Sequence, residues 1–144
     1  MTIREFHKKL KALDIHYLKE EAVFRNREEL VRLNQSQLHL GETATGDNIS
    51  PSYRDRDYAE YKTMLSSYEA PNFVPDLFVT GEFYKGMDVE VGNNEYDIYS
   101  RDEKNDDLTL KYKDIFGLQD KNKEIAMQLV TKTFVNLISE KLKN

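Results

Sequence analysis

The clearest hydrophobic pattern in the chain is a two-residue alternation near its middle. The apolar positions of this alternation, with acidic residues between them, are Met87, Val89, Val91, Tyr96 and Ile98. Gly92-Asn93-Asn94 separates the two halves and supplies the small residues that a tight hairpin needs. Because a lone two-stranded ribbon is marginal in water, the pattern predicts an antiparallel hairpin at about 86–100 with one face covered by the helices that flank it.

Apolar residues at helical spacing predict two N-terminal helices. A T-x-x-E capping box at Thr2 precedes an apolar series that indicates a first helix over about 3–13. Asp14 is suited to cap a second helix, which runs on through Leu33 and ends at Gly41. The two helices are also compatible with one kinked helix.

Two polar loops enclose a third helix. Residues 41–50 and 66–75 contain the Gly, Pro, Asn and Ser residues that are typical of loops. The apolar stripe of the helix between them consists of Tyr58, Tyr61, Leu65 and Tyr68. Three tyrosines on one stripe suit a contact surface, because each ring packs while its hydroxyl reaches water or a partner. The alternative is that they fill the gap between helix and sheet.

The strongest apolar stripe lies at the C-terminal end. A short helix starting near Asp102 and a buried turn around Gly117 precede a long helix at about 120–142. Its apolar positions are Ile125, Leu129, Val130, Phe134, Leu137, Ile138 and Leu142. We expect this stripe to pack on the apolar face of the hairpin. The predicted fold is a single α+β domain over 1–144, with an N-terminal helical arm over 1–41 and a core over 49–144.

Composition narrows the class of protein. A chain of 144 residues that is 39% hydrophobic and 33% charged predicts one folded domain with a polar surface. The absence of cysteine excludes a disulfide scaffold, and no apolar run suggests a signal peptide or a membrane span. The net charge of −5, with basic and acidic residues interspersed, argues against a nucleic-acid-binding patch. We expect a soluble protein made in the cytoplasm, without membrane contact.

The residue patterns that catalysis requires are not visible. The three histidines, His7, His16 and His39, form no H-x-x-x-H or H-E-x-x-H pattern and are expected on helix surfaces. The chain has no G-x-S-x-G elbow, and GETATGDN lacks the Lys-Ser/Thr ending of a phosphate-binding loop. The sequence therefore predicts that the protein is not an enzyme and binds no cofactor.

Acidic residues are densest just after the hairpin, at Asp102, Glu103, Asp106 and Asp107. A calcium loop needs an alternating D-x-D-x-D-G spacing, which is absent here. Acidic residues at the start of a helix are stabilised by the helix dipole, which explains the cluster without a metal. The sequence predicts no metal site, and an enzyme that acts through this cluster is the least favoured alternative.

Several short motifs occur in an order that is similar to a known family. They are Ile49-x-Pro51-x-Tyr53, Tyr58-Ala59-x-x-Lys62, Pro75-Asp76-Leu77-x-x-Thr80-Gly81-x-Phe83-x-x-Gly86-Met87, the hairpin, Asp102-Glu103-Lys104 and Lys111-Tyr112-x-Asp114-Ile115-Phe116-Gly117-Leu118. With the long C-terminal helix, this set resembles the small neck proteins of long-tailed bacteriophages, which are head–tail connector or tail-completion proteins. The resemblance covers about 49–142 and leaves the N-terminal helices unmatched.

The chain departs from the family at two places. Related proteins often carry His-x-Gly after the second strand and Arg-Pro before the phenylalanine. Here the corresponding places hold Tyr112-Lys113-Asp114 and Ile115. The departures leave both a connector and a tail terminator open.

The resemblance implies a structural protein of the virion neck, assembled in the host cytoplasm as a homo-oligomeric ring between the portal complex and the tail. Neighbouring connector and tail proteins would be its partners, and DNA would pass through an acidic lumen without specific binding. A ring needs two unlike faces on each subunit, and the hairpin edge and the tyrosine helix are our candidates. The predicted interface residues are Tyr58, Tyr61, Tyr68, Phe73, Phe83, Asn93, Asn94 and Tyr99. The alternative is a non-enzymatic adaptor that binds one partner protein.

Overall fold

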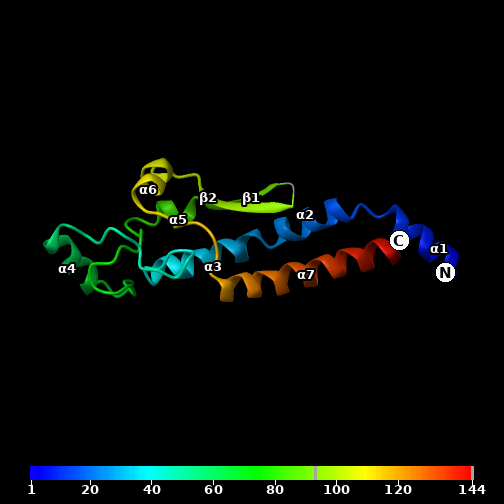
Figure 1. Cartoon of the computed structure of the whole chain (residues 1–144), viewed down its shortest axis with the longest axis horizontal. Helices are drawn as coiled ribbons and strands as arrows, with labels where there is room; N and C mark the ends of the chain where they lie inside the picture. The colour runs from blue at the N-terminus through cyan, green and yellow to red at the C-terminus, as the bar shows by residue number, and fades with distance from the viewer. Residues whose placement is uncertain (93, 144) are drawn as a thin grey trace.

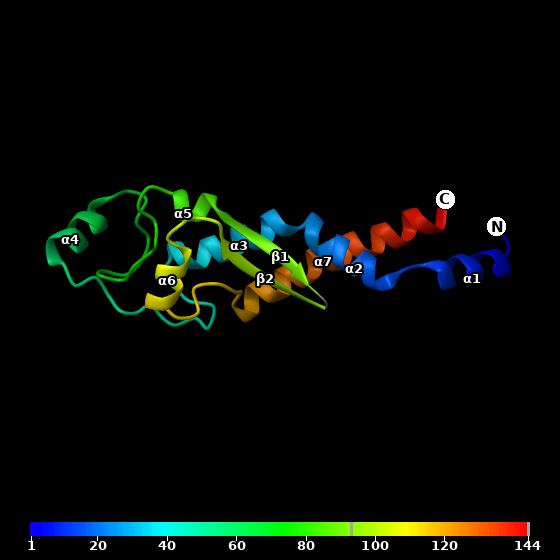
Figure 2. The same ribbon diagram turned by 90° about the horizontal axis from the view of Figure 1, so that it is seen from above.

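Two consecutive helices, α2 (Ile15–Arg25) and α3 (Arg27–His39), form the central layer of the molecule. In the computed structural model, which describes residues 1–92 and 94–143, a hairpin lies on one side of this layer and α7 (Asp120–Lys143) on the other (Figure 1). The remaining elements are α1 (Ile3–Ala12), α4 (Arg56–Met64), α5 (Glu82–Lys85), β1 (Met87–Gly92), β2 (Glu95–Ser100) and α6 (Asn105–Lys111). The long axis runs from α4 at one end to α1 at the other (Figure 2). The α+β prediction is confirmed.

The N-terminal helices begin where their capping residues predict. Thr2 Oγ1 accepts a hydrogen bond from Glu5 N at 3.1 Å, and Asp14 Oδ1 accepts one from Tyr17 N at 3.0 Å. A further break at Asn26 was not predicted. The Asn26 side-chain amide donates to Ala22 O at 2.8 Å and to Thr133 Oγ1 at 2.9 Å. The Asn26 side chain thus stabilises the break by bonding both α2 and α7. Local hydrophobic periodicity gives no sign of such a bond.

The hairpin has the predicted apolar face, and the structure adds the register of its two strands. Val89 lies opposite Ile98, and Val91 lies opposite Tyr96. The side chains of Met87, Val89 and Ile98 are buried, whereas Val91 and Tyr96 nearer the tip are half-buried. The two strands form a sheet of their own, β1 beside β2.

The main partner of α7 is α2 rather than the hairpin. The hairpin packs chiefly on α3 and α2, while α7 packs along α2 from the opposite side. A second, smaller apolar cluster joins Leu18 and Ala22 of α2 to Leu137 of α7. The expectation that the C-terminal stripe packs on the hairpin is thus wrong in its detail, because most of the stripe packs on α2, and Val130 of α7 lies near Val91 and Tyr96 at the hairpin tip.

The segment 1–41, predicted as an arm, divides into two different parts. Leu30 and Leu38 of α3 have no exposed surface and belong to the main core. By contrast, α1 buries no residue. The short helix α5 was not predicted, because four residues are too few to show a helical period.

A network of buried amides holds the turn at 115–119 against α3. Asn34 Nδ2 donates to Ile115 O at 2.9 Å, and Asn34 Oδ1 accepts from Gly117 N at 2.9 Å. Gln37 Nε2 donates to Gly117 O at 2.9 Å, while Gln37 Oε1 accepts from Gln119 N at 2.8 Å and from Asn122 Nδ2 at 2.7 Å. These side chains replace the backbone partners that the turn lacks, so the predicted burial of this turn is confirmed and its cause is polar as well as apolar.

Gly41 ends α3 in the predicted C′ position. Its N–H bonds Leu38 O at 2.9 Å and the N–H of Glu42 bonds Gln37 O at 2.9 Å, which is the Schellman arrangement. The glycine has a φ of 74°, and a Cβ placed on it would lie 2.6 Å from Val74 Cγ1.

We expect Gly41→Ala to lower the free energy of unfolding by about 2–3 kcal/mol, since it combines left-handed strain with a clash. Chemical denaturation of the purified variant measures this loss. Gly46→Ala is the matched control, because Gly46 has a φ of 91° but nothing within 4 Å of an added Cβ. The control should lose only about 1 kcal/mol; equal losses in the two variants would contradict the role of the close contact with Val74.

Candidate functional site

The predicted tyrosine stripe is only partly a helical surface. Tyr58 and Tyr61 lie on α4 with ring centroids 6.4 Å apart, and Tyr61 is 58% exposed. Tyr68 lies beyond the end of α4, and its hydroxyl is 2.5 Å from Pro71 O and 2.7 Å from Val74 O. The prediction of one three-tyrosine stripe is therefore wrong, because α4 ends at Met64 and the Tyr68 hydroxyl bonds backbone oxygens of the loop that follows.

Two phenylalanines of the predicted interface have opposite surroundings. Phe73 is 39% exposed, and its carbonyl oxygen accepts a hydrogen bond from Tyr53 N at 2.8 Å. Phe83 is only 4% exposed and packs against Phe116 with ring centroids 5.7 Å apart. Phe83 is corrected from an interface residue to a core residue, because α5 turns its ring inward. We call Tyr58, Tyr61, Met64 and Phe73 the α4 surface.

The hairpin residues of the predicted interface lie away from the α4 surface. Asn94 is exposed and has a φ of 64°, as the second residue of a tight turn requires. Tyr99 is half-buried, with its hydroxyl 3.4 Å from Arg101 Nε. Asn93 lies outside the described residues. Apart from the buried Phe83, the described residues of the predicted interface thus lie in two separate regions, one at and just after α4 and one on the hairpin (Figure 1).

A buried ion pair beneath α4 was not predicted. Lys62 Nζ lies 2.8 Å from Asp76 Oδ1, with side-chain exposures of 4% and 2%. Lys62 also donates to Phe78 O, and Asp76 Oδ1 accepts a hydrogen bond from Phe78 N at 3.1 Å. Lys62 belongs to the motif Tyr58-Ala59-x-x-Lys62 and Asp76 to the motif Pro75-Asp76-Leu77. The sequence thus singled out both residues but did not indicate that their side chains pair.

Tyrosines surround this ion pair. The Tyr84 hydroxyl donates to Asp76 O at 2.5 Å. Burial raises the pKa of Tyr84 above its ordinary value, and the charge of Asp76 raises it further. The pKa of Tyr53 is raised by burial and then by Asp76 in the same way. Both phenols therefore stay protonated, and the Tyr84 hydroxyl serves as a donor. No buried side-chain nitrogen or oxygen in the described residues lacks a hydrogen-bond partner.

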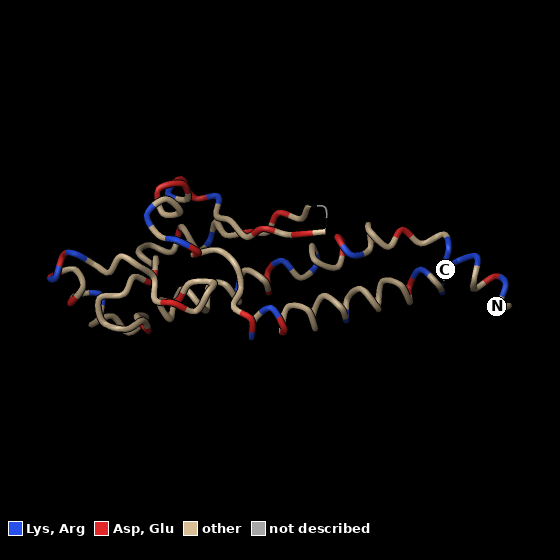
Figure 3. Tube along the Cα trace, in the orientation of Figure 1, with Lys and Arg blue, Asp and Glu red and all other residues tan. Residues whose placement is uncertain are grey.

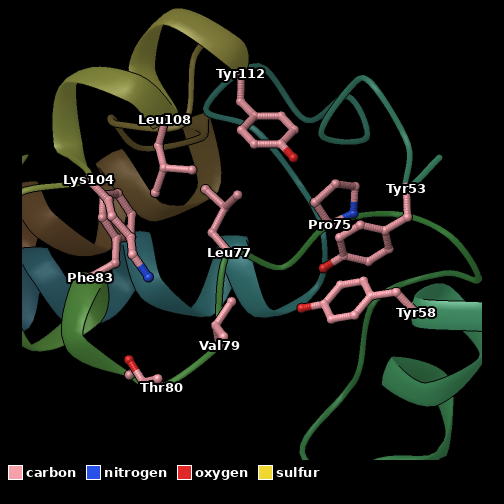
Figure 4. Close-up of a pocket in the computed structure, with 11 residues that line it drawn as sticks. Tyr53, Tyr58, Pro75, Leu77, Val79, Thr80, Phe83, Lys104, Leu108 and Tyr112 are labelled. Atoms are coloured by element: carbon pink, nitrogen blue, oxygen red, sulfur yellow. The ribbon is translucent and has the colours of Figure 1, made fainter. Parts of the chain in front are cut away.

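A small apolar cavity lies beside the pair. Its volume is about 110 Å³. Tyr53 and Tyr58 line one side, and Phe83, Lys104 and Leu108 line the other (Figure 4). A cavity of about 150 Å³ holds benzene, so this one has room for about one apolar side chain. We take it as a feature of the α4 end rather than as a substrate site.

The acidic cluster after the hairpin forms the approach to α6. Asp102 and Glu103 precede the helix, while Asp106 and Asp107 lie in its first turn. In the described part of the chain, no group of three or more His, Asp or Glu side chains lies close enough to hold a metal ion. No helix among residues 1–92 and 94–143 is long and apolar enough to cross a membrane.

The structure offers two unlike surfaces and a sheet with open edges. The α4 surface is aromatic and lies at one end, whereas the hairpin lies over the middle of the molecule and carries acidic side chains (Figure 3). Such an arrangement can bind other chains at two places through different chemistry. No protein-family model matches this chain, and comparisons with curated proteins and with solved structures found no match.

Proposed function

We propose that this protein is a structural component of a tailed-phage virion, a ring-forming neck protein of the connector or tail-completion type. The motif resemblance over 49–142 motivates the proposal. The elements over this range follow each other as the resemblance implies: two strands, a buried turn around Gly117 and a long helix. The proposal places the protein between the portal complex and the tail.

The observation that carries the proposal is the open edge of the hairpin. The sheet has two strands, and in the described residues no third strand pairs with β1 or β2. Unpaired strand edges are templates for pairing with another chain. A closed ring requires two different surfaces that bind each other, and the hairpin edge and the α4 surface meet that requirement.

The donors available at the edge follow from the register. Gly92 and Glu95 face each other across a two-residue loop, so their backbones exchange two hydrogen bonds. Hydrogen-bonded pairs alternate with non-hydrogen-bonded pairs in an antiparallel ladder. The N–H groups of the next pair, Val91 and Tyr96, therefore point away from the partner strand. Farther from the turn, Val89 N already donates a hydrogen bond to Oδ1 of the preceding residue, Asp88, at 2.8 Å. The tip half of the hairpin is therefore the part that can accept another strand.

We expect Val91→Pro to abolish ring formation and leave the monomer folded. Proline removes the outward N–H without breaking a hydrogen bond between β1 and β2. Sedimentation velocity measures assembly, and thermal unfolding measures the fold. Val91→Thr is the matched control, since it keeps both the shape of the side chain and the N–H. Normal rings from the proline variant, or equal loss in the threonine variant, would exclude edge pairing.

The proposed role as a neck protein is tested with the purified chain and with purified phage particles. Electron microscopy of the purified chain should show rings at high concentration, and gold labelling of purified phage particles should mark the neck. A chain that is absent from particles and forms a 1:1 complex with one host protein would overturn the proposal in favour of an adaptor. The net charge of −5 fits an acidic lumen that repels DNA, and a ring with a bore lined by Lys and Arg would contradict this part.

A further inference from the structure

The first helix exposes an apolar stripe. Ile3, Phe6 and Leu10 recur at i, i+3 and i+7 and are 90%, 41% and 40% exposed. The helix touches the end of α7, where Lys9 Nζ donates to Leu142 O at 3.3 Å. A helix of this length is marginal in water by itself. The spacing of the stripe is the one that amphipathic helices use to bind in a groove.

A groove of matching character lies between the hairpin tip and α2. Its volume is about 440 Å³. The apolar residues that line it are Val23, Val91, Tyr96 and Val130. Glu20, Glu95 and Lys19 also line it. The groove thus offers an apolar floor with charged side chains at its rim, which an amphipathic helix can cover.

The charges of α1 and the hairpin are complementary. Residues 1–13 contain one acidic residue, Glu5, against the four basic residues Arg4, Lys8, Lys9 and Lys11. Residues 87–100 contain no Lys or Arg, and their acidic residues are Asp88, Glu90, Glu95 and Asp97. Asp88 is paired with Arg101 at 2.6 Å, whereas the other three form no ion pair within the described residues. The two segments are basic and acidic respectively (Figure 3).

We propose that α1 of one copy docks its apolar stripe into the hairpin–α2 groove of the next copy. In the chain itself, α1 lies beyond the C-terminal end of α7, away from the groove (Figures 1 and 2). The contact joins α1 of one copy to a different surface, the groove, of the next copy. It is therefore a heterologous contact, which can repeat around a ring. The inference rests on the proposed ring and names a second contact between its subunits, beside the one at the hairpin edge.

Cross-linking between two single-cysteine chains tests this contact directly. The chain has no cysteine of its own, so a disulfide reports only the introduced pair. An Ile3→Cys chain mixed with a Glu95→Cys chain under mild oxidation should give a covalent heterodimer. Glu60→Cys, at an exposed position on α4, is the control partner and should give much less.

Two results of this experiment would overturn the proposal. One is equal cross-linking of the Ile3→Cys chain to the hairpin and to α4. The other is a double-cysteine chain, carrying both Ile3→Cys and Glu95→Cys, that closes within one molecule at high dilution. The second result would mean that α1 folds back onto its own hairpin.

Charge reversal provides the second test on the full chain. Lys8→Glu/Lys11→Glu and Glu90→Lys/Glu95→Lys should each weaken self-association by about tenfold at low salt, and mixing the two variants should restore it. Vesicles containing phosphatidylserine probe the alternative, since basic amphipathic helices also bind anionic lipid. Vesicle binding that is lost in Lys8→Glu/Lys11→Glu, without any effect on self-association, would overturn the proposal in favour of a membrane surface.

The outcomes separate this inference from the proposed function. Normal rings from the charge-reversed chains would overturn α1 docking and leave the neck assignment standing. A wild-type chain that cross-links α1 to the hairpin but is absent from phage particles would remove the neck assignment and leave the docking contact.

Discussion

Replacing Gln37 with leucine is expected to lower the free energy of unfolding by at least about 3 kcal/mol. The Gln37 amide bonds Gly117 O, Gln119 N and Asn122 Nδ2, at 2.9, 2.8 and 2.7 Å. Gln37 itself is only 2% exposed, so water cannot readily replace it in the variant. Each buried group left without a partner costs about 1–3 kcal/mol. Urea denaturation followed by circular dichroism measures the loss.

The matched control is Gln128→Leu on α7. Gln128 is exposed, and the same change of side chain there should alter the free energy of unfolding by less than about 0.5 kcal/mol. Hydrogen exchange adds a local readout, because the Gln119 amide, which donates to Gln37 Oε1, should lose protection first in Gln37→Leu. A loss below about 1 kcal/mol would show that the Gln37 hydrogen bonds contribute little and that Asn34, Ile115 and Leu118 hold the turn without them.

Lys62→Met is expected to lower the free energy of unfolding by about 3–5 kcal/mol. The variant keeps most of the apolar stem of Lys62 but leaves the Asp76 carboxylate without its cation, at 2% exposure. Removing one partner of a buried ion pair costs more than the pair contributes, because the remaining charge is buried without compensation. Thermal and chemical unfolding measure the loss.

Two further variants identify its cause. Lys62→Met/Asp76→Leu should recover part of the loss, because the uncompensated charge is then gone. Arg56→Met removes the Arg56–Glu60 pair on the exposed side of α4, where the side chains are 82% and 57% exposed, and should cost less than about 1 kcal/mol. If the double variant is less stable than Lys62→Met, the ion pair is not the source of the effect.

Helix caps and the hairpin face were predicted correctly from the sequence, whereas contacts between distant segments were not. Thr2, Asp14 and Gly41 delimit helices as their capping chemistry predicts, because a cap acts within one turn of its own helix. The alternation around Val89 places the buried face of the hairpin correctly for the same local reason. The interface residues depend on longer-range geometry. Phe83 in particular is buried because α5 directs it into the core.

Polar residues in the core show the same limit. Asn34, Gln37, Lys62 and Asp76 are all at most 3% exposed, although residues of these types are usually found on the surface. Their burial depends on partners that lie between 14 and 85 positions away along the chain. Hydropathy patterns carry no information about such partners, so these residues could be recognised as structural only in the folded molecule.

The sequence by itself determined the α+β class, the buried face of the hairpin and the helix ends marked by Thr2, Asp14 and Gly41, since periodicity and caps act over a few neighbouring positions. Only the tertiary structure decided that α7 packs mainly on α2 while the hairpin packs mainly on α3 and α2, and that polar side chains hold the turn at 115–119. It also decided which apolar surface stays uncovered. The stripe of α1 has the same spacing as a core stripe, yet its residues remain exposed in the described fold.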